Sequence, residues 1–151
     1  MPSAFQVVRL TPADLATMRR LNFVFGAAFE DPERYLDAPP PDEHLTGLLA
    51  KDHVIVLAAI LNGEVIGGLV AYELEKFEKA RRELYIYDLA VEEASRRQGV
   101  ATALIGALQA LGRERGASVI FVQADHGDEP AMRLYESLGA REEVLHYDIP
   151  V

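Results

Sequence analysis

Cysteine is absent from this chain of 151 residues. Its absence excludes disulfides, thiolate zinc sites and a cysteine nucleophile. No apolar run approaches the length that spans a membrane, and the N-terminal segment lacks a basic stretch followed by an apolar core, so we expect neither a membrane helix nor a secretory signal. The four histidines show no metal-ligand spacing, so no metal site is expected. A cytoplasmic protein fits these absences.

Basic residues are in the minority. The chain has 15 Lys and Arg against 24 Asp and Glu, a net charge of −9, and a pI of about 4.9. Nucleic-acid binding normally requires a basic face, so it is disfavoured. An acidic surface indicates either simple solubility or attraction of a cationic partner, and composition does not choose between them. The length and the 50% hydrophobic content predict one folded domain over residues 1–151.

The hydropathy pattern predicts an α/β fold with a mixed, mostly antiparallel sheet and the order β-α-α-β-β-β-α-β-α-β. Thr11 is the expected N-cap of the first helix, with Pro12 at its first position. Residues 30–44 are expected to form a loop, and residues 62–64 a hairpin turn. The predicted strands are 5–10, 53–61, 64–74, 83–91, 118–124 and 142–149, and the predicted helices are 12–29, 42–50, 99–115 and 130–138.

The stretch RRQGVA, residues 96–101, stands between an apolar strand and a helix. Two arginines at a helix start oppose the helix dipole unless an anion binds there. Free N–H groups of the first helical turn, a glycine that permits close approach and two arginines together suit a phosphate. The alternative is a solvated basic turn. The expected cofactor-binding residues here are Arg96, Arg97, Gln98, Gly99, Val100, Ala101 and Thr102.

The motif R-x-x-G-x-A, read here as Arg96, Gly99 and Ala101, resembles the acetyl-CoA signature of the Gcn5-related N-acetyltransferases (GNAT superfamily). The element order and the stretch LYESLGA (134–140) resemble that family too. More narrowly, the blocks ELYIYDLAV, RRQGVATALI, VQADHGDEPA and REEVLHYDI are similar to aminoglycoside 3-N-acetyltransferases, which modify gentamicin-type antibiotics. The resemblance implies acetyl-CoA as cosubstrate, an aminoglycoside as acceptor, and a homodimer.

The resemblance also implies roles for single residues. The pantetheine arm of the cofactor would pair with the strand end at Leu89, Ala90 and Val91, and Tyr135 would protonate the leaving thiolate. A packing role is the alternative for Tyr135. Because the chain has no cysteine and no G-x-S-x-G elbow, direct attack of the substrate amine on the thioester is favoured.

Asp88 is the first candidate for the general base. It interrupts a strand that otherwise reads as buried, and a buried acid needs a partner or a purpose. A structural salt bridge is the alternative, and Asp125, at the end of the next strand, is the second candidate. Strand alternation places Tyr85 and Tyr87 on one face and Asp88 on the other, unless a bulge near Leu89, common in this family, re-aims one of them.

A polycationic acceptor requires an acidic, polar cleft. The carboxylates of residues 125–129, with the loop 30–37 as another wall, are placed to line one, while His126 reads as a solvated loop residue. The expected substrate-binding residues are Tyr87, Asp125, Asp128, Glu129 and Asp148. Two other functions stay open at this point: acetylation of another polyamine or a protein amine, and a non-catalytic module that senses CoA.

Overall fold

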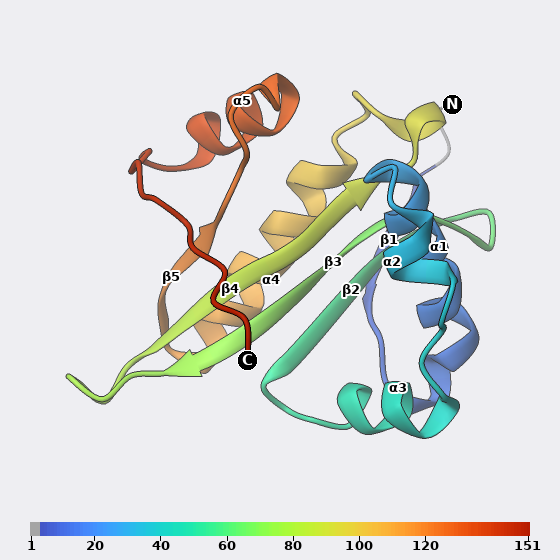
Figure 1. The fold of residues 1–151 in the computed structure, drawn as a ribbon, viewed down its shortest axis with the longest axis horizontal. Coiled ribbons are helices and arrows are strands. Elements are labelled where there is room, and N and C mark those ends of the chain that lie inside the picture. Colours follow the sequence, from blue (N-terminus) through green and yellow to red (C-terminus); the bar gives the residue numbers. More distant parts are fainter. Residues whose placement is uncertain (1–3) are drawn as a thin grey trace.

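The computed structural model describes residues 4–151 and is built around one five-stranded sheet with strand order β1-β2-β3-β4-β5 (Figure 1). The strands are antiparallel except for β4 and β5, which are parallel. The strands are β1 (Gln6–Arg9), β2 (Val54–Leu61), β3 (Glu64–Glu75), β4 (Arg82–Val91) and β5 (Ala117–Val122). The helices are α1 (Leu15–Ala28), α2 (Pro32–Leu36), α3 (Asp42–Leu49), α4 (Val100–Arg115) and α5 (Glu129–Leu138), with short 3-10 turns η1 (Pro12–Asp14) and η2 (Glu93–Ser95).

Each face of the sheet has its own core. On one face, α1 and α3 pack with Leu21, Phe25 and Leu45 against alternate residues of β2 and β3. On the other face, α4 packs with Leu104 and Leu108 against the remaining strand residues. Strands β2 and β3 are covered on both sides, which explains their continuous apolar runs. No described helix is long and apolar enough to cross a membrane.

The predicted helix cap at Thr11 and the predicted hairpin turn at residues 62–64 are both confirmed. Thr11 accepts from the N–H of Ala13, and the Asp14 carboxylate accepts from the N–H of Thr11, so the first helical segment begins with a capping box. Asn62 and Gly63 have φ of 51° and 79°, the left-handed pair that a tight hairpin between β2 and β3 requires.

Two expectations are wrong. Residues 30–44 are not all loop, because α2 forms inside them: Asp31 caps it by accepting from the N–H of Arg34, and Pro32 is its first residue. Residues 142–149 do not form a strand in this structure, and the whole segment is exposed. Its alternating pattern is that of a strand, but the segment pairs with none of the described strands.

The far end of α4 is tied to the sheet by an ion cluster. Arg115 donates from Nε to Glu73 Oε1 at 2.7 Å and from Nη2 to Asp52 Oδ2 at 2.8 Å. The Glu73 side chain is 4% exposed and that of Arg115 is 13% exposed. The hydrogen bond from Arg115 lowers the pKa of the Glu73 carboxyl, against the opposing effect of burial. This cluster fixes where α4, and therefore its N-terminus, lies on the sheet.

We expect Arg115→Met to lower the free energy of unfolding by about 3 kcal/mol, because the buried Glu73 would lose both hydrogen bonds from Arg115 and keep only the longer ion pair with Arg82, at 3.7 Å. Arg113→Met removes an exposed arginine from the same last turn and serves as the matched control. Because the pKa of Glu73 is lowered in the folded state, the stability it contributes is present above the pKa of an unfolded glutamate and is lost as pH falls through the folded value. The difference between wild type and variant in chemical denaturation should therefore shrink on acidification; a constant difference would contradict this account.

Candidate functional site

Strands β4 and β5 separate before β4 ends. Their parallel pairing stops at Ile86 opposite Val122, whereas β4 continues to Val91 and stays paired with β3 on its other side. One backbone edge of residues 87–91 therefore has no strand partner within the described chain. We call this gap the β4–β5 opening. It contains the predicted cofactor contacts Leu89, Ala90 and Val91. Apart from the Val91 carbonyl oxygen, which accepts from Arg96, the backbone groups on this edge lack a strand partner, and an extended ligand can use them.

The turn after β4 leads directly into α4 and leaves its N–H groups free. Within residues 4–151, no backbone or side-chain acceptor bonds to the N–H groups of residues 97–102. Arg97 and Gly99 both have left-handed backbone conformations, with φ of 64° and 79°. The position that a Cβ of Gly99 would take has no described atom within 4 Å, so the space beside this backbone is open. Free amides at a helix start, facing open space, suit an anion.

Some side chains of this turn contact the rest of the fold, and others face solvent. Arg96 donates from Nε to the carbonyl oxygen of Val91 at 3.1 Å, which ties the turn to the end of β4. Arg97 and Thr102 are exposed and make no side-chain hydrogen bond to the described residues. The Val100 side chain is buried in the core, so its contribution to a ligand is its N–H group alone. Gln98 is exposed and donates weakly to the carbonyl oxygen of Ala94.

A bulge decides where Asp88 points. Val70 pairs with Asp88 but the next residue, Ala71, pairs with Ile86, so Tyr87 is an extra residue in β4. The bulge expected near Leu89 therefore lies at Tyr87, and it places Asp88 on the sheet face that carries α1 instead of the face that simple alternation predicts.

Asp88 has a specific partner. Tyr35, from α2, donates its hydroxyl to Asp88 Oδ1 at 2.7 Å. Burial raises the pKa of the Asp88 carboxyl, while the hydrogen bond from Tyr35 and the charge of Arg34 act in the opposite direction. The pKa of Tyr35 is raised well above its usual value by burial and by this carboxylate, so Tyr35 stays a donor. No described cation forms a salt bridge with Asp88, so the structural salt bridge considered from the sequence is not formed.

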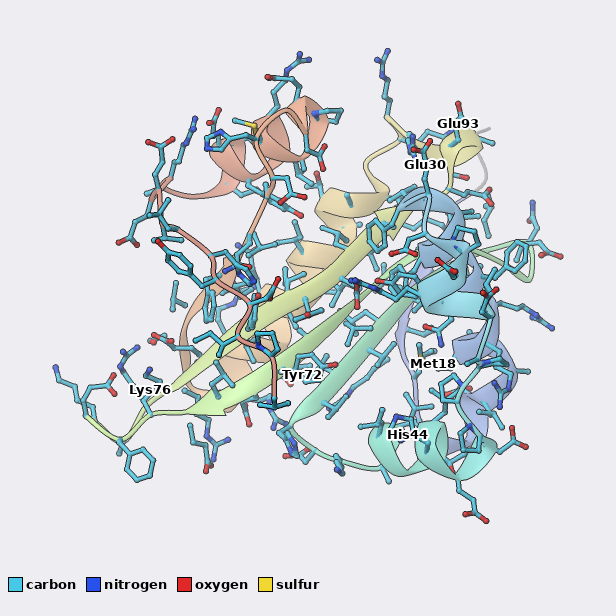
Figure 2. All side chains as sticks on the ribbon, in the orientation of Figure 1. Met18, Glu30, His44, Tyr72, Lys76 and Glu93 are labelled. Atoms are coloured by element: carbon cyan, nitrogen blue, oxygen red, sulfur yellow. The ribbon has the colours of Figure 1, made fainter. Side chains whose placement is uncertain are left out.

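Asp88 lies in the wall of a small cavity between α1, α3 and the sheet. Its volume is about 170 Å³, and polar groups of Asn22, His44 and Tyr72 share the wall with apolar side chains. Figure 2 shows Tyr72 on the sheet and His44 on the helix beside it. The volume is below the roughly 300 Å³ of a drug-sized pocket. The cavity can therefore take an amino group and part of one ring, with the rest of a larger molecule outside.

Aromatic side chains extend from this cavity across the open part of the sheet. The rings of Tyr72 and Tyr87 are 6.1 Å apart, those of Tyr85 and Tyr87 are 5.7 Å apart, and Tyr85 stacks on Phe121 at 4.6 Å. Tyr87 is 63% exposed. The predicted substrate contact Tyr87 is thus beside Asp88 and available to a ligand.

Tyr135 approaches from the opposite side of the sheet. It is half-buried on α5 and packs against the core beneath α4, whereas Asp88 is on the α1 face. Burial, with a smaller contribution from Asp128, raises the pKa of Tyr135 to about 12, so its hydroxyl keeps its proton at neutral pH. Tyr135 and Asp88 therefore belong to opposite faces of the sheet, which the β4–β5 opening interrupts.

The remaining acidic candidates are all exposed, and none is hydrogen-bonded to Asp88. Asp128 caps α5 by accepting from the N–H of Ala131 at 3.4 Å. Asp148 pairs with His146 at 2.9 Å within the C-terminal segment. Asp125 and Glu129 make no ion pair in the part of the chain that the structure describes. The structure places Asp125, Asp128 and Glu129 in one exposed stretch that leads into α5, of which Glu129 is the first residue, whereas Asp148 lies in the C-terminal segment.

Tyr35 is the residue of the candidate site that could not be predicted from the sequence. It is 53 positions from Asp88, and only the tertiary fold brings the two together. The stretch 30–37 was expected to form a wall of the cleft, but nothing in its spacing singles out Tyr35. A carboxyl group inside a buried strand signals that some donor must reach it, without saying which.

Tyr35→Phe should move the acidic limb of the pH–rate profile to higher pH, because it removes a hydrogen bond that favours the ionised form of Asp88. A hydrogen bond to a charged group contributes about 1.5–3 kcal/mol, so the acidic limb should move by about one to two pH units. The control is Tyr85→Phe, which removes a hydroxyl that donates to Gln123. Initial rates measured across pH test this. An unmoved acidic limb in Tyr35→Phe would show that Tyr35 does not position Asp88.

Comparison with known proteins identifies the family to which this chain is similar. The sequence profile of the acetyltransferase (GNAT) family matches residues 18–140. The aminoglycoside acetyltransferase HMB0005, from an uncultured soil metagenomic sample, is 54% identical, and the match covers 98% of this chain and 99% of that chain with a TM-score of 0.96. A second such enzyme, meta-AAC0020, solved in complex with sisomicin, is 34% identical over 97% of this chain and 96% of that chain, with a TM-score of 0.90.

A curated bacterial protein matches as well. The uncharacterized N-acetyltransferase YhfO of Bacillus subtilis is 27% identical over 117 residues, which are 76% of this chain and 78% of that protein. The residues that match the GNAT family profile, 18–140, include strands β2 to β5, the turn before α4 and Tyr135. The similarity therefore includes the part of the chain that forms the β4–β5 opening.

Proposed function

Because the chain belongs to the acetyltransferase (GNAT) family, we propose that it acetylates the 3-amino group of the deoxystreptamine ring of gentamicin-type aminoglycosides. GNAT enzymes are N-acetyltransferases that use acetyl-CoA, which supplies the acetyl group as a thioester. The observation that carries the proposal is the Asp88 carboxylate, held by Tyr35 in a small cavity beside the β4–β5 opening. The two soil enzymes of the aminoglycoside class support the choice of acceptor.

The residues of the turn before α4 fit the donor. The free N–H groups of residues 97–102 and the exposed guanidinium of Arg97 would hold the pyrophosphate. Gly99 leaves the backbone accessible at that point. The unpaired backbone edge of residues 87–91 would pair with the pantetheine arm, and an N–H group of the same edge, near Leu89, would polarise the thioester carbonyl.

Proton movement is divided between two side chains. Asp88 accepts a proton from the substrate ammonium, directly or through water, and the freed amine forms the new N–C bond with the acetyl carbon. As the C–S bond breaks, Tyr135 gives its hydroxyl proton to the departing thiolate. The attacking nitrogen loses a second proton as the amide forms, and this proton passes through water to the Tyr135 oxygen. Asp88 releases its proton to solvent, so ammonium and thioester become amide, free thiol and one released proton. Direct attack needs no acyl-enzyme, which agrees with a chain without cysteine.

The charge of the surroundings suits a polycationic acceptor. One amino group would enter the cavity at Asp88, while other ammonium groups would meet the exposed carboxylates of Asp125, Asp128 and Glu129 and the ring of Tyr87. The net charge of −9 favours the approach of a cation from a distance. Acetylation removes one positive charge from the antibiotic, so a role in antibiotic resistance, in the cytoplasm, goes with this proposal.

A panel of amines tests the proposal. Release of free thiol from acetyl-CoA should be measured with gentamicin, sisomicin, spermidine and a lysine-containing peptide. We expect turnover on gentamicin and sisomicin and little on the others. Turnover on spermidine or the peptide alone would assign the enzyme to another acceptor class, and binding of CoA without turnover on any amine would identify a sensor.

A further inference from the structure

The cavity beside Asp88 has a wall that is mostly apolar. Leu45 of α3, Val54 of β2 and Val70 of β3 are among its lining residues. Val70 pairs with Asp88 across β3 and β4, so its apolar side chain is the direct neighbour of the carboxylate on that face of the sheet. A ligand that brings an amine to Asp88 therefore places the carbon atoms next to that amine against hydrocarbon.

Two polar side chains in the same wall have no use within the protein. Neither the Tyr72 hydroxyl nor the Asn22 amide makes a hydrogen bond within residues 4–151, although both side chains are partly buried. Burial and the charge of Asp88 raise the pKa of Tyr72, so its hydroxyl stays uncharged and its oxygen can accept a hydrogen bond. No Lys or Arg of the described chain lines the cavity. These groups suit a second amine of the same ligand.

The deoxystreptamine ring has one edge that matches this wall. Its 3-amino and 1-amino groups flank C2, the one ring carbon that carries neither oxygen nor nitrogen. A hydroxyl turned toward an apolar wall loses its hydrogen bonds to water without replacement. The edge from C3 to C1, with its two nitrogens, has five non-hydrogen atoms and needs about 150 Å³ at the roughly 30 Å³ that one water molecule takes up in the liquid. The cavity volume of about 170 Å³ holds that edge.

Taking the proposed 3-amino acceptor as the premise, we propose that this cavity selects aminoglycosides that lack a hydroxyl at C2. The 3-amino group meets Asp88, and the C2 methylene lies against Val70 and Leu45. The 1-amino group, on the other side of C2, donates to Tyr72 or Asn22. A ring with a hydroxyl between the same two amines buries that hydroxyl against hydrocarbon and is disfavoured.

The first test compares two acceptors that differ at C2 alone: sisomicin and its analogue built on streptamine, which carries a hydroxyl at C2. We expect kcat/KM for the streptamine analogue to be about 100-fold lower, the discrimination that an apolar pocket achieves against an added hydroxyl. Equal kcat/KM for the two acceptors would overturn this inference and leave the proposed function standing. Absence of turnover on sisomicin itself would overturn the proposed function, on which the inference rests.

A polar group in the wall should relax the selection. Val70→Thr keeps the size of the side chain and places a hydroxyl beside C2. We expect the ratio of kcat/KM for the two acceptors to fall by about tenfold, the worth of one neutral hydrogen bond. The matched control is Val65→Thr, which changes a similarly buried residue of the same core cluster outside the cavity wall and should keep the wild-type ratio.

The same ratio in Val70→Thr and Val65→Thr would show that Val70 does not face C2 and would overturn the proposal. The comparison of the two acceptors uses the wild-type chain, so it does not depend on either variant folding.

Discussion

Replacing Asp88 with asparagine should lower kcat for acetylation by about 100-fold or more, while the affinity for acetyl-CoA stays unchanged. Asparagine keeps the shape of the side chain and can still contact the Tyr35 hydroxyl, but it cannot accept the proton of the substrate ammonium. The turn before α4, where we propose that the pyrophosphate binds, is a separate part of the site and should not respond. Steady-state kinetics with gentamicin and calorimetric titration with CoA separate the two effects.

The matched control for Asp88 is Asp125→Asn. Asp125 is exposed and was the second candidate for the base, so its substitution should mainly weaken aminoglycoside binding and leave kcat close to wild type. The wild-type rate should fall as pH drops through a value above that of an ordinary aspartate, because burial raises the pKa of Asp88. If Asp88→Asn kept a near-normal rate while Asp125→Asn lost it, the base would be Asp125.

Gly99→Val should weaken CoA binding by about tenfold to 100-fold, an estimate equivalent to one or two charge-assisted hydrogen bonds. Gly99 has φ of 79°, a conformation that a β-branched residue strongly disfavours, so the turn and its free N–H groups must move. A valine side chain would also occupy the open space beside the backbone. Calorimetric titration of the variant with CoA measures the loss.

Gly116→Val separates this local effect from loss of stability. Gly116 stands at the opposite end of α4 with φ of 73°, and its Cβ would likewise meet no described atom within 4 Å. Both variants should lose about 1–2 kcal/mol of stability from the left-handed backbone. Only Gly99→Val should lose affinity for CoA. Equal affinity in the two variants would contradict the placement of the pyrophosphate at the turn before α4.

Features that rest on neighbouring residues could be predicted from the sequence. The conflict between two arginines and a helix start at residues 96–101 points to an anion, and the structure shows free N–H groups at that point. The Asp88 carboxyl inside an apolar strand is an anomaly that any reading of the strand detects. The sheet face on which the Asp88 side chain lies could not be predicted from strand alternation. The extra residue at Tyr87 reverses the order of inward and outward side chains for the rest of β4.

Features that rest on distant residues could not be predicted. The contact between Tyr35 and Asp88 joins α2 to β4, and no local pattern marks it. The segment 142–149 has the composition of a strand, but pattern alone does not say which edge is free to pair with it, and in a single chain none of the described strands does so. Helix α2 was not predicted, because the prolines that follow it indicate a loop for the whole stretch 30–44. Asp31 and Pro32 nevertheless form a regular helix start.

The most direct test of the proposed function is the position of the acetyl group on the product. Gentamicin or sisomicin should be incubated with the enzyme and acetyl-CoA, and the product analysed by mass spectrometry and two-dimensional NMR. We predict a single added acetyl group, on the 3-amino nitrogen of the deoxystreptamine ring, and no product with Asp88→Asn. Acetylation at another amine, or an unmodified antibiotic with active, CoA-binding protein, would contradict the account.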